Sequence, residues 1–222
     1  MLKYLGNFAL VAQWIERRSP EPKAVGSIPI RRTTKDRLIA NICKRSFFIE
    51  DKINKGNKVN NDMVNSPEYW MKKALEEAYL AKNEMEIPVG AVIVKDGNII
   101  GRGHNLREKN RDIFSHAEIN AIKEACNFLN DWRLENCDLY VTLEPCPMCS
   151  GTILQTKLSR VFFGAYNERE GCGGSVINLL DYPGMSWQTE CWGGIMQEDC
   201  SQLLKKFAVE IRNVNCKIKL NT

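Results

Sequence analysis

From Ser66 onward, stretches with helical periodicity alternate with short β-branched runs, and this alternation constrains the fold more than any other feature of the sequence. Residues 67–82 carry apolar side chains on one stripe, and Ser66 followed by Pro67 is typical of a helix start. The runs PVGAVIV (88–94) and NIIGRGH (98–104) flank an Asp-Gly turn. This arrangement predicts a β-hairpin.

The rest of the body continues the same pattern. Further predicted elements are helices at 116–129, 146–156 and 196–213 and strands at 138–143 and 160–166. Strands that alternate with helices after an initial hairpin imply a mixed sheet with helices on both faces. We therefore expect an α/β fold, a three-layer α/β/α domain with a central mixed sheet over residues 66–213, followed by a short tail at 214–222.

Charge is distributed unevenly along the 222 residues. Residues 1–66 hold 13 Lys and Arg against 6 Asp and Glu, whereas the remaining residues hold 18 against 21. The body is therefore not a general binder of polyanions, and any nucleic acid must be met by a local patch. The candidate patches are Arg107, Lys109 and Arg111 in one loop and Lys205, Lys206 and Arg212 on the last helix, where an ordinary solvated surface is the favoured interpretation.

The first third lacks the periodicity of a domain. Residues 11–33 mix short apolar runs with Pro, Arg and Glu, and AQWIER and VGSIPI can be read, in that order, as translations of the D-arm and T-arm of a tRNA gene. We hypothesise that residues 1–65 are a spurious N-terminal extension, with the true start near Met63 or Met71. An organelle-targeting peptide is the alternative, but its acidic residues oppose it. The Asn- and Lys-rich run at 54–65 is typical of disorder.

Cysteine usage and hydropathy bear on the compartment. The nine cysteines are scattered, no secretory signal precedes them, and no apolar run approaches the roughly 18 residues of a membrane span. We expect reduced thiols in a soluble, cytoplasmic protein with no membrane association.

Two of these cysteines form the chemically most informative motif. Cys146 and Cys149 are three residues apart, so in a helix beginning near Pro145 they share one face of its first turn. The positive end of the helix dipole lowers thiol pKa values, and we expect both sulfurs to be thiolates. An isolated C-x-x-C is also typical of a redox couple or of half a structural zinc site.

The remaining ligands separate these alternatives. The chain has two histidines and no second cysteine pair, and His104 is expected to be structural because it ends a strand. His116 opens a predicted helix that Ser115 is placed to cap. One His and two Cys leave the fourth tetrahedral position of Zn²⁺ open, as in a catalytic site.

Glu118 completes the constellation. Positions two apart on a regular helix diverge by about 200°, so His116 and Glu118 converge only if His116 lies in an irregular first turn. Glu118 is then expected to transfer protons without binding the metal. The patterns His116-Ala117-Glu118 and Pro145-Cys146-Pro147-Met148-Cys149 match the H-x-E and P-C-x-x-C signature of zinc-dependent nucleobase deaminases.

Residues 67–212 resemble the bacterial tRNA-specific adenosine deaminases, a TadA-like family within the cytidine deaminase-like superfamily. The resemblance lies in the stretches PVGAVIV, GRGHN, HAEI, DWRL, LYVTLEPCPMC and GAY. It implies a cytidine deaminase-like fold and a homodimeric hydrolase that converts adenosine to inosine at the wobble position of a tRNA anticodon stem-loop. It also implies that His116, Cys146 and Cys149 hold Zn²⁺, that Glu118 moves protons, and that Asn105 hydrogen-bonds the flipped nucleoside. A turn residue after the second strand is an equally favoured interpretation of Asn105.

Two sequence features and two alternative functions stay open. Asn167 stands where this family usually has an acid near the tRNA backbone, which bears on whether RNA or DNA is preferred. Cys172 and Cys191 could approach a metal, although thiols without a metal role are the favoured interpretation. The alternative function is deamination of a free nucleobase, nucleoside or nucleotide of the guanine, cytosine or dCMP type. A non-enzymatic zinc-stabilised interaction module would tolerate Glu118→Gln.

Overall fold

A computed structural model describes residues 66–220, and a five-stranded sheet forms the centre of this part of the chain. The strand order is β2-β1-β3-β4-β5. The strands are β1 (Gly90–Lys95), β2 (Asn98–His104), β3 (Asp138–Leu143), β4 (Arg160–Ala165) and β5 (Glu190–Gly193). β1 pairs antiparallel with β2 and β3, whereas β3–β4 and β4–β5 are parallel, so the predicted mixed sheet is confirmed.

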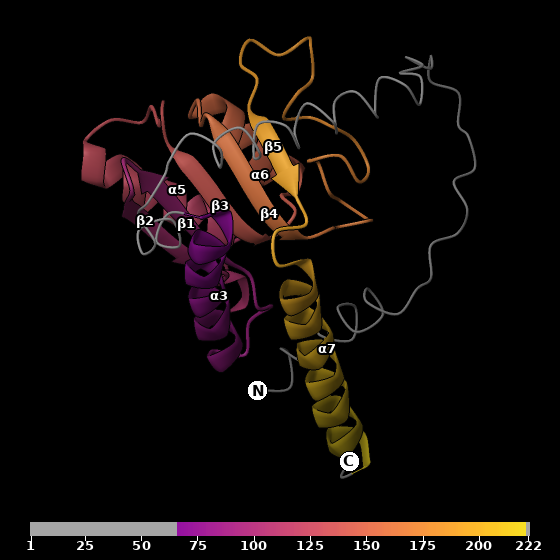
Figure 1. Ribbon diagram of the computed structural model, residues 1–222. Coiled ribbons are helices and arrows are strands. Elements are labelled where there is room, and N and C mark those ends of the chain that lie inside the picture. The colour runs from indigo at the N-terminus through magenta and orange to yellow at the C-terminus, as the bar shows by residue number, and fades with distance from the viewer. Residues whose placement is uncertain (1–65, 221–222) are drawn as a thin grey trace, which may run out of the picture. The chain divides into compact units, whose positions relative to one another are not determined.

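Helices cover both faces of this sheet (Figure 1). They are α3 (Pro67–Asn83), α4 (Arg107–Asn110), α5 (Ala117–Leu129), α6 (Pro147–Gln155) and α7 (Gln197–Leu220). α3 and α7 lie on one face, and α5 and α6 lie on the other, with α6 joining the parallel strands β3 and β4. The three-layer α/β/α prediction is confirmed, and the elements that carry the predicted site residues belong to the α5 and α6 side.

Glycines in the strands allow the helices to approach closely. A Cβ built on Gly90 would lie 2.1 Å from the Ala74 carbonyl oxygen of α3, and one built on Gly103 would lie 2.3 Å from the Ala117 carbonyl oxygen of α5. Both distances are far below van der Waals contact, so no side chain fits there. The glycines of the stretches PVGAVIV and GRGHN therefore fix how near α3 and α5 lie to the sheet.

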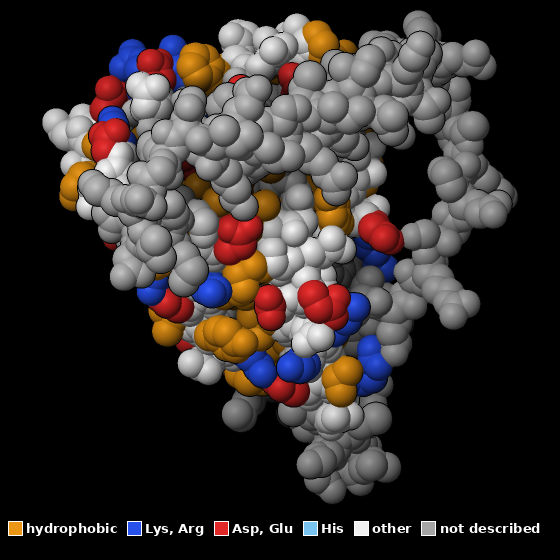
Figure 2. Space-filling model, viewed as in Figure 1, with side chains coloured by type: hydrophobic (Ala, Val, Ile, Leu, Met, Phe, Trp, Pro, Cys, Tyr) orange, Lys and Arg blue, Asp and Glu red, His pale blue; other side chains and the backbone are white. Residues whose placement is uncertain are grey.

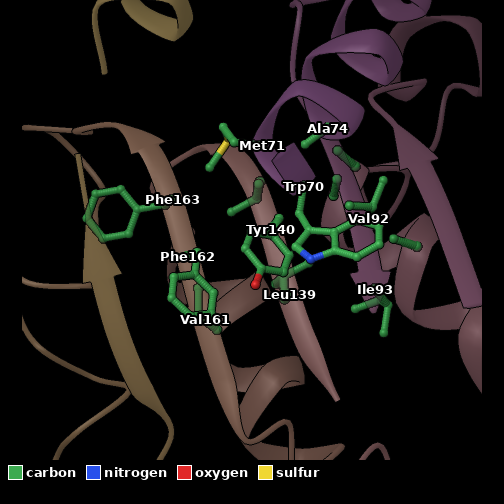
Figure 3. Close-up of a cluster of buried hydrophobic side chains, with 14 of the residues drawn as sticks. Trp70, Met71, Ala74, Val92, Ile93, Leu139, Tyr140, Val161, Phe162 and Phe163 are labelled. Atoms are coloured by element: carbon green, nitrogen blue, oxygen red, sulfur yellow. The ribbon is translucent and has the colours of Figure 1, made fainter. Parts of the chain in front are cut away.

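Apolar side chains fill both spaces between the sheet and the helices (Figure 3). On the α3 side, Tyr140 stacks on Phe162 with ring centroids 4.7 Å apart, and Phe162 stacks on Trp192 at 4.9 Å. Trp70 of α3 packs against Tyr140, with ring centroids 6.4 Å apart. These aromatic contacts run across β3, β4 and β5 and tie α3 to the sheet.

The predicted start of α3 and the predicted hairpin turn agree with the structure. Ser66 caps α3, since its hydroxyl accepts a hydrogen bond from the Tyr69 amide at 3.2 Å. Asp96 and Gly97 both have positive φ, at 50° and 73°, as the predicted two-residue hairpin turn requires. None of the helices within residues 66–220 is both long and apolar enough to cross a membrane.

Some element boundaries differ from the prediction. α6 begins at Pro147 rather than near Pro145, because Cys146 has extended backbone angles and is the N-cap residue. Helix α7 continues past Asn213 to Leu220, and the short elements α4 and β5 were not predicted. The proposed extension at residues 1–65 lies outside the described residues, and its origin stays a prediction.

Candidate metal centre

His116, Cys146 and Cys149 converge between the first turns of α5 and α6. The Nδ1 atom of His116 lies 3.7 Å from the Cys146 sulfur and 3.5 Å from the Cys149 sulfur. Their ligand atoms lie within 4.8 Å of one another, and among residues 66–220 no other group of three or more His, Cys, Asp or Glu side chains comes together in this way. The structure therefore brings together the three residues predicted as ligands.

These distances fit a tetrahedral zinc ion. Zinc–sulfur bonds of about 2.3 Å and zinc–nitrogen bonds of about 2.0–2.1 Å, at a tetrahedral angle, separate sulfur and nitrogen by about 3.6 Å. Both observed separations lie within 0.1 Å of this value. Two sulfurs and one imidazole are also a donor set that zinc prefers, and three protein ligands leave one coordination position open.

The backbone at both helix starts explains how the ligands meet. His116 and Cys146 are the N-cap residues of α5 and α6, with φ and ψ of −75° and 153° and of −75° and 173°. These extended angles are the irregular first turn predicted for His116, and they allow Glu118 to face the same site. Ser115 does not cap α5; its hydroxyl donates to the Asp112 carboxylate at 3.0 Å.

Protonation differs between the two thiols. Cys149 hydrogen-bonds to Cys146, and this bond together with the one to His116 lowers the pKa of the Cys146 thiol to about 4 despite its burial. The same thiol–thiol bond and burial raise the pKa of Cys149. Metal binding to Cys149 therefore has to release a proton.

Glu118 is buried against this cluster, at 5% exposure. Burial raises its pKa, while the charge of His116 and a hydrogen bond involving Cys149 partly oppose that shift. A carboxylate with a raised pKa beside a metal position is suited to accept and return a proton near neutral pH. Glu118 lies beside the predicted ligands, and its role in proton transfer stays a prediction.

The other predicted residues lie in three different environments. His104 is structural as expected, because its Nδ1 lies 3.2 Å from the Glu77 carboxylate. Cys172 and Cys191 do not belong to the metal cluster of the described residues. Asn167 is buried, and its side-chain oxygen accepts the backbone amides of residues 169 and 170, so it stabilises a turn. Whether Asn167 lies near a bound tRNA backbone stays a prediction.

Asn105 is buried, at 6% exposure, in the segment between β2 and α4. Its neighbour Leu106 donates its amide to the Ser115 carbonyl at 2.9 Å, and the His104 carbonyl accepts from the Asn120 side chain at 2.9 Å. Both bonds tie this segment to the start of α5. Asn105 is therefore held beside the part of the chain that carries His116 and Glu118.

The sequence did not identify two buried carboxylates that bond to segments around the site. Glu144, which precedes Pro145, is 1% exposed and accepts the backbone amides of Asn167, Gly173 and Ser175 at 2.9–3.0 Å. It thereby fixes the loop after β4 next to Cys146. The second is Glu86, which bonds to Asn105. The sequence feature that could have identified both residues is a carboxylate next to an apolar strand. An unpaired charge is costly at such a position, so the carboxylate is expected to have hydrogen-bond partners.

Comparisons with known proteins agree with this geometry. Residues 64–165 match the family model described as the cytidine and deoxycytidylate deaminase zinc-binding region. A tRNA-specific adenosine deaminase from Bacillus subtilis (strain 168) is 45% identical over 145 residues, which are 65% of this chain and 90% of that protein. A tRNA-specific adenosine deaminase from Aquifex aeolicus (strain VF5) is 45% identical over 146 residues, which are 66% of this chain and 96% of that protein.

Solved structures give the same result. A structure from a study of A-to-I editing by tRNA:A34 deaminases has a TM-score of 0.59 and 35% identity, covering 61% of this chain and 98% of that chain. A guanine deaminase from Nitrosomonas europaea, at 21% identity and a TM-score of 0.58, covers 72% of this chain and 97% of its own and shares the fold. The three residues are a suitable ligand set for zinc, and the match spans 90% and 96% of the two relatives' lengths. The chain therefore belongs to the family of tRNA-specific adenosine deaminases.

Proposed function

We propose that the chain hydrolyses adenosine to inosine at the wobble position of a tRNA anticodon. The observation that carries this proposal is the buried Glu118 beside a three-ligand metal site, in a chain that is 45% identical to tRNA-specific adenosine deaminases. A closed structural site would use four protein ligands. An interaction module would have no use for a carboxylate buried beside the three ligands.

Each site residue then has a distinct task. His116, Cys146 and Cys149 would hold zinc, which would supply the Lewis acidity that makes water nucleophilic at neutral pH. Glu118 takes a proton from the attacking water and delivers it to the purine ring. It then carries the remaining hydroxyl proton to the departing amino group. The oxygen of water thus replaces the amino group at carbon six, ammonia leaves, and inosine results.

Recognition of the nucleoside is assigned to Asn105, whose segment is bonded to the start of α5. The base has to leave the anticodon stack to reach a buried carboxylate, and a fixed amide at the site can hydrogen-bond the extruded nucleoside. Arg107, Lys109 and Arg111 are exposed on and beside α4, in the chain segment leading to His116. Their exposure and charge support the assignment of phosphate contacts with the anticodon stem-loop to these three side chains.

The charges of α7 are a weaker candidate for RNA contact. On the part of the α3 and α7 face visible in Figure 2, Lys and Arg side chains lie among Asp and Glu side chains. Lys82 of α3, for example, pairs with Glu210 of α7 at 2.7 Å. Mixed charge of this kind is typical of a solvated surface and does not form a continuous basic patch.

A homodimer acting in the cytoplasm is part of the same proposal. The family resemblance supports the dimer, and a tRNA substrate together with reduced cysteines supports the compartment. Mass measurement in solution tests the dimer, and a monomer at micromolar concentration that still deaminates a stem-loop would exclude a shared active site.

The decisive experiment for the reaction compares cells with and without this gene. Inosine is sequenced as guanosine in cDNA. The cDNA of the tRNA with a wobble adenosine should therefore show guanosine at that position only when the gene is present. An unchanged adenosine in both samples would contradict the proposal. In vitro, faster turnover of free guanine, cytosine or adenosine than of an anticodon stem-loop would favour a deaminase of free bases or nucleosides.

A further inference from the structure

Glu86 is a buried carboxylate outside the metal centre, between α3 and β1, and it is only 1% exposed. One of its oxygens accepts the Lys109 backbone amide at 2.7 Å, and the other accepts the Asn105 side-chain amide at 3.1 Å. Burial raises the pKa of Glu86, which means that the fold works against the charged form. A buried carboxylate is costly unless its bonds serve a purpose.

The bond to Asn105 sets the direction of its amide group. An ionised carboxylate only accepts hydrogen bonds, so the nitrogen of Asn105 has to face Glu86. The carbonyl oxygen, on the other branch of the planar amide, then points away from Glu86. The carbonyl oxygen of Asn105 is thereby directed away from Glu86 and can accept a hydrogen bond from a ligand.

Backbone bonds hold the rest of this unit in place. The backbone amide of Asn105 donates to the Val89 carbonyl at 3.0 Å. The backbone amide of its neighbour Leu106 donates to the carbonyl of Ser115, which precedes His116. The bond from Lys109 to Glu86 anchors α4 to the same carboxylate. The position of Asn105 is thus determined by the backbone, and the orientation of its amide is determined by Glu86.

We propose that Glu86 is a positioning residue for deamination, which orients Asn105 so that its carbonyl oxygen accepts an N–H or O–H group of the extruded nucleoside. This inference rests on the proposed role of Asn105 in substrate binding. In this proposal Glu86 contacts neither zinc nor substrate. It acts only by fixing which end of the Asn105 side-chain amide faces the nucleoside.

Glu86→Gln tests the polarity directly, because the two side chains have nearly the same shape. The Gln oxygen can still accept the Lys109 amide, but its nitrogen would face the nitrogen of Asn105. Asn105 then has to turn and present its NH2 group to the substrate. We expect kcat/KM for an anticodon stem-loop to fall about tenfold to a hundredfold, with zinc content and the urea midpoint unchanged.

A second substitution should restore the lost polarity. In Glu86→Gln with Asn105→Asp, the Asp carboxylate accepts from Gln with one oxygen and offers the other to the substrate. We expect the double variant to recover most of the activity, while Asn105→Asp alone, with two facing carboxylates, stays defective. Glu84→Gln is the matched control, since Glu84 pairs with the Lys109 ammonium at 2.9 Å on the surface and should have little effect.

Three outcomes would overturn the inference. They are wild-type kcat/KM in Glu86→Gln, a double variant no more active than Glu86→Gln, and a loss of zinc or stability that accounts for the whole defect.

A spectroscopic measurement distinguishes failure of the proposed function from failure of the inference about Glu86. If the wild-type protein deaminates no stem-loop, the function fails, but the 15N resonance of the Asn105 side chain still reports its bond. We expect one slowly exchanging, downfield amide proton that is lost in Glu86→Gln. An unchanged resonance would overturn the inference, whatever the substrate is.

Discussion

Replacing Gly103 with alanine should displace the helix that begins at the metal site. The added Cβ would lie 2.3 Å from the Ala117 carbonyl oxygen and 2.4 Å from the Ala121 amide nitrogen of α5. Ordinary contact begins at 3.4 Å, so α5 has to recede by about 1.1 Å near its first turn. His116 immediately precedes this turn and Glu118 lies within it.

The size of this shift decides the expected result. Zinc–ligand distances tolerate about 0.2 Å, and overpacking of this kind costs about 1–3 kcal/mol of unfolding free energy. We therefore expect Gly103→Ala to unfold at lower urea concentration, to retain less than one zinc per chain and to lose at least tenfold in kcat. Urea titration, metal analysis by mass spectrometry and single-turnover deamination measure the three effects.

Gly151 provides the matched control. It lies in α6, two residues after Cys149, and a Cβ built there meets no atom within 4 Å. Alanine at this helical position should increase the free energy of unfolding by about 0.5–1 kcal/mol and leave zinc bound. The reasoning is refuted if Gly103→Ala is as stable and as fully zinc-loaded as the wild type.

Three further predictions address individual side chains. Glu118→Gln should retain zinc and lose about 10²–10⁴-fold in kcat, and unchanged turnover would favour a non-enzymatic zinc module. Glu144→Ala should lower the free energy of unfolding in urea by about 3 kcal/mol, because three backbone amides lose a charged acceptor; a change under 1 kcal/mol would contradict this. In zinc-free protein at pH 6, iodoacetamide should label Cys146, whose pKa is about 4, before Cys137, whose pKa is raised to about 11 by burial; zinc should protect Cys146, and equal labelling rates would contradict the assignment.

The sequence was most informative where local chemistry determines the structure. The Asp96-Gly97 turn, the Ser66 cap and the amphipathic helices were predictable because their signals lie within a few residues. The ligand set was predictable for a related reason. Metal chemistry restricts which residue types can meet, and the chain offers only two histidines.

Features that depend on distant partners were not predictable in the same way. β5 has only four residues and exists as a strand because it pairs with β4, and Glu144 acquires its role from amides 23–31 residues away. The turn that the Asn167 side-chain oxygen stabilises was also not predicted, because no sequence pattern indicates which backbone amides this oxygen accepts.

The protonation of Cys146 and Cys149 also required the structure. The helix dipole acts on both thiols, but their mutual hydrogen bond lowers one pKa and raises the other. Coupling of this kind depends on side-chain distances, which the spacing C-x-x-C does not specify.

The central claim is that an ion held by His116, Cys146 and Cys149 is required for deamination of tRNA, and its most direct test is turnover of an anticodon stem-loop before and after metal removal. We predict that the stripped protein produces no inosine and that one equivalent of Zn²⁺ per chain restores the original rate. Inosine formation at an undiminished rate in protein shown to contain no metal would contradict this account.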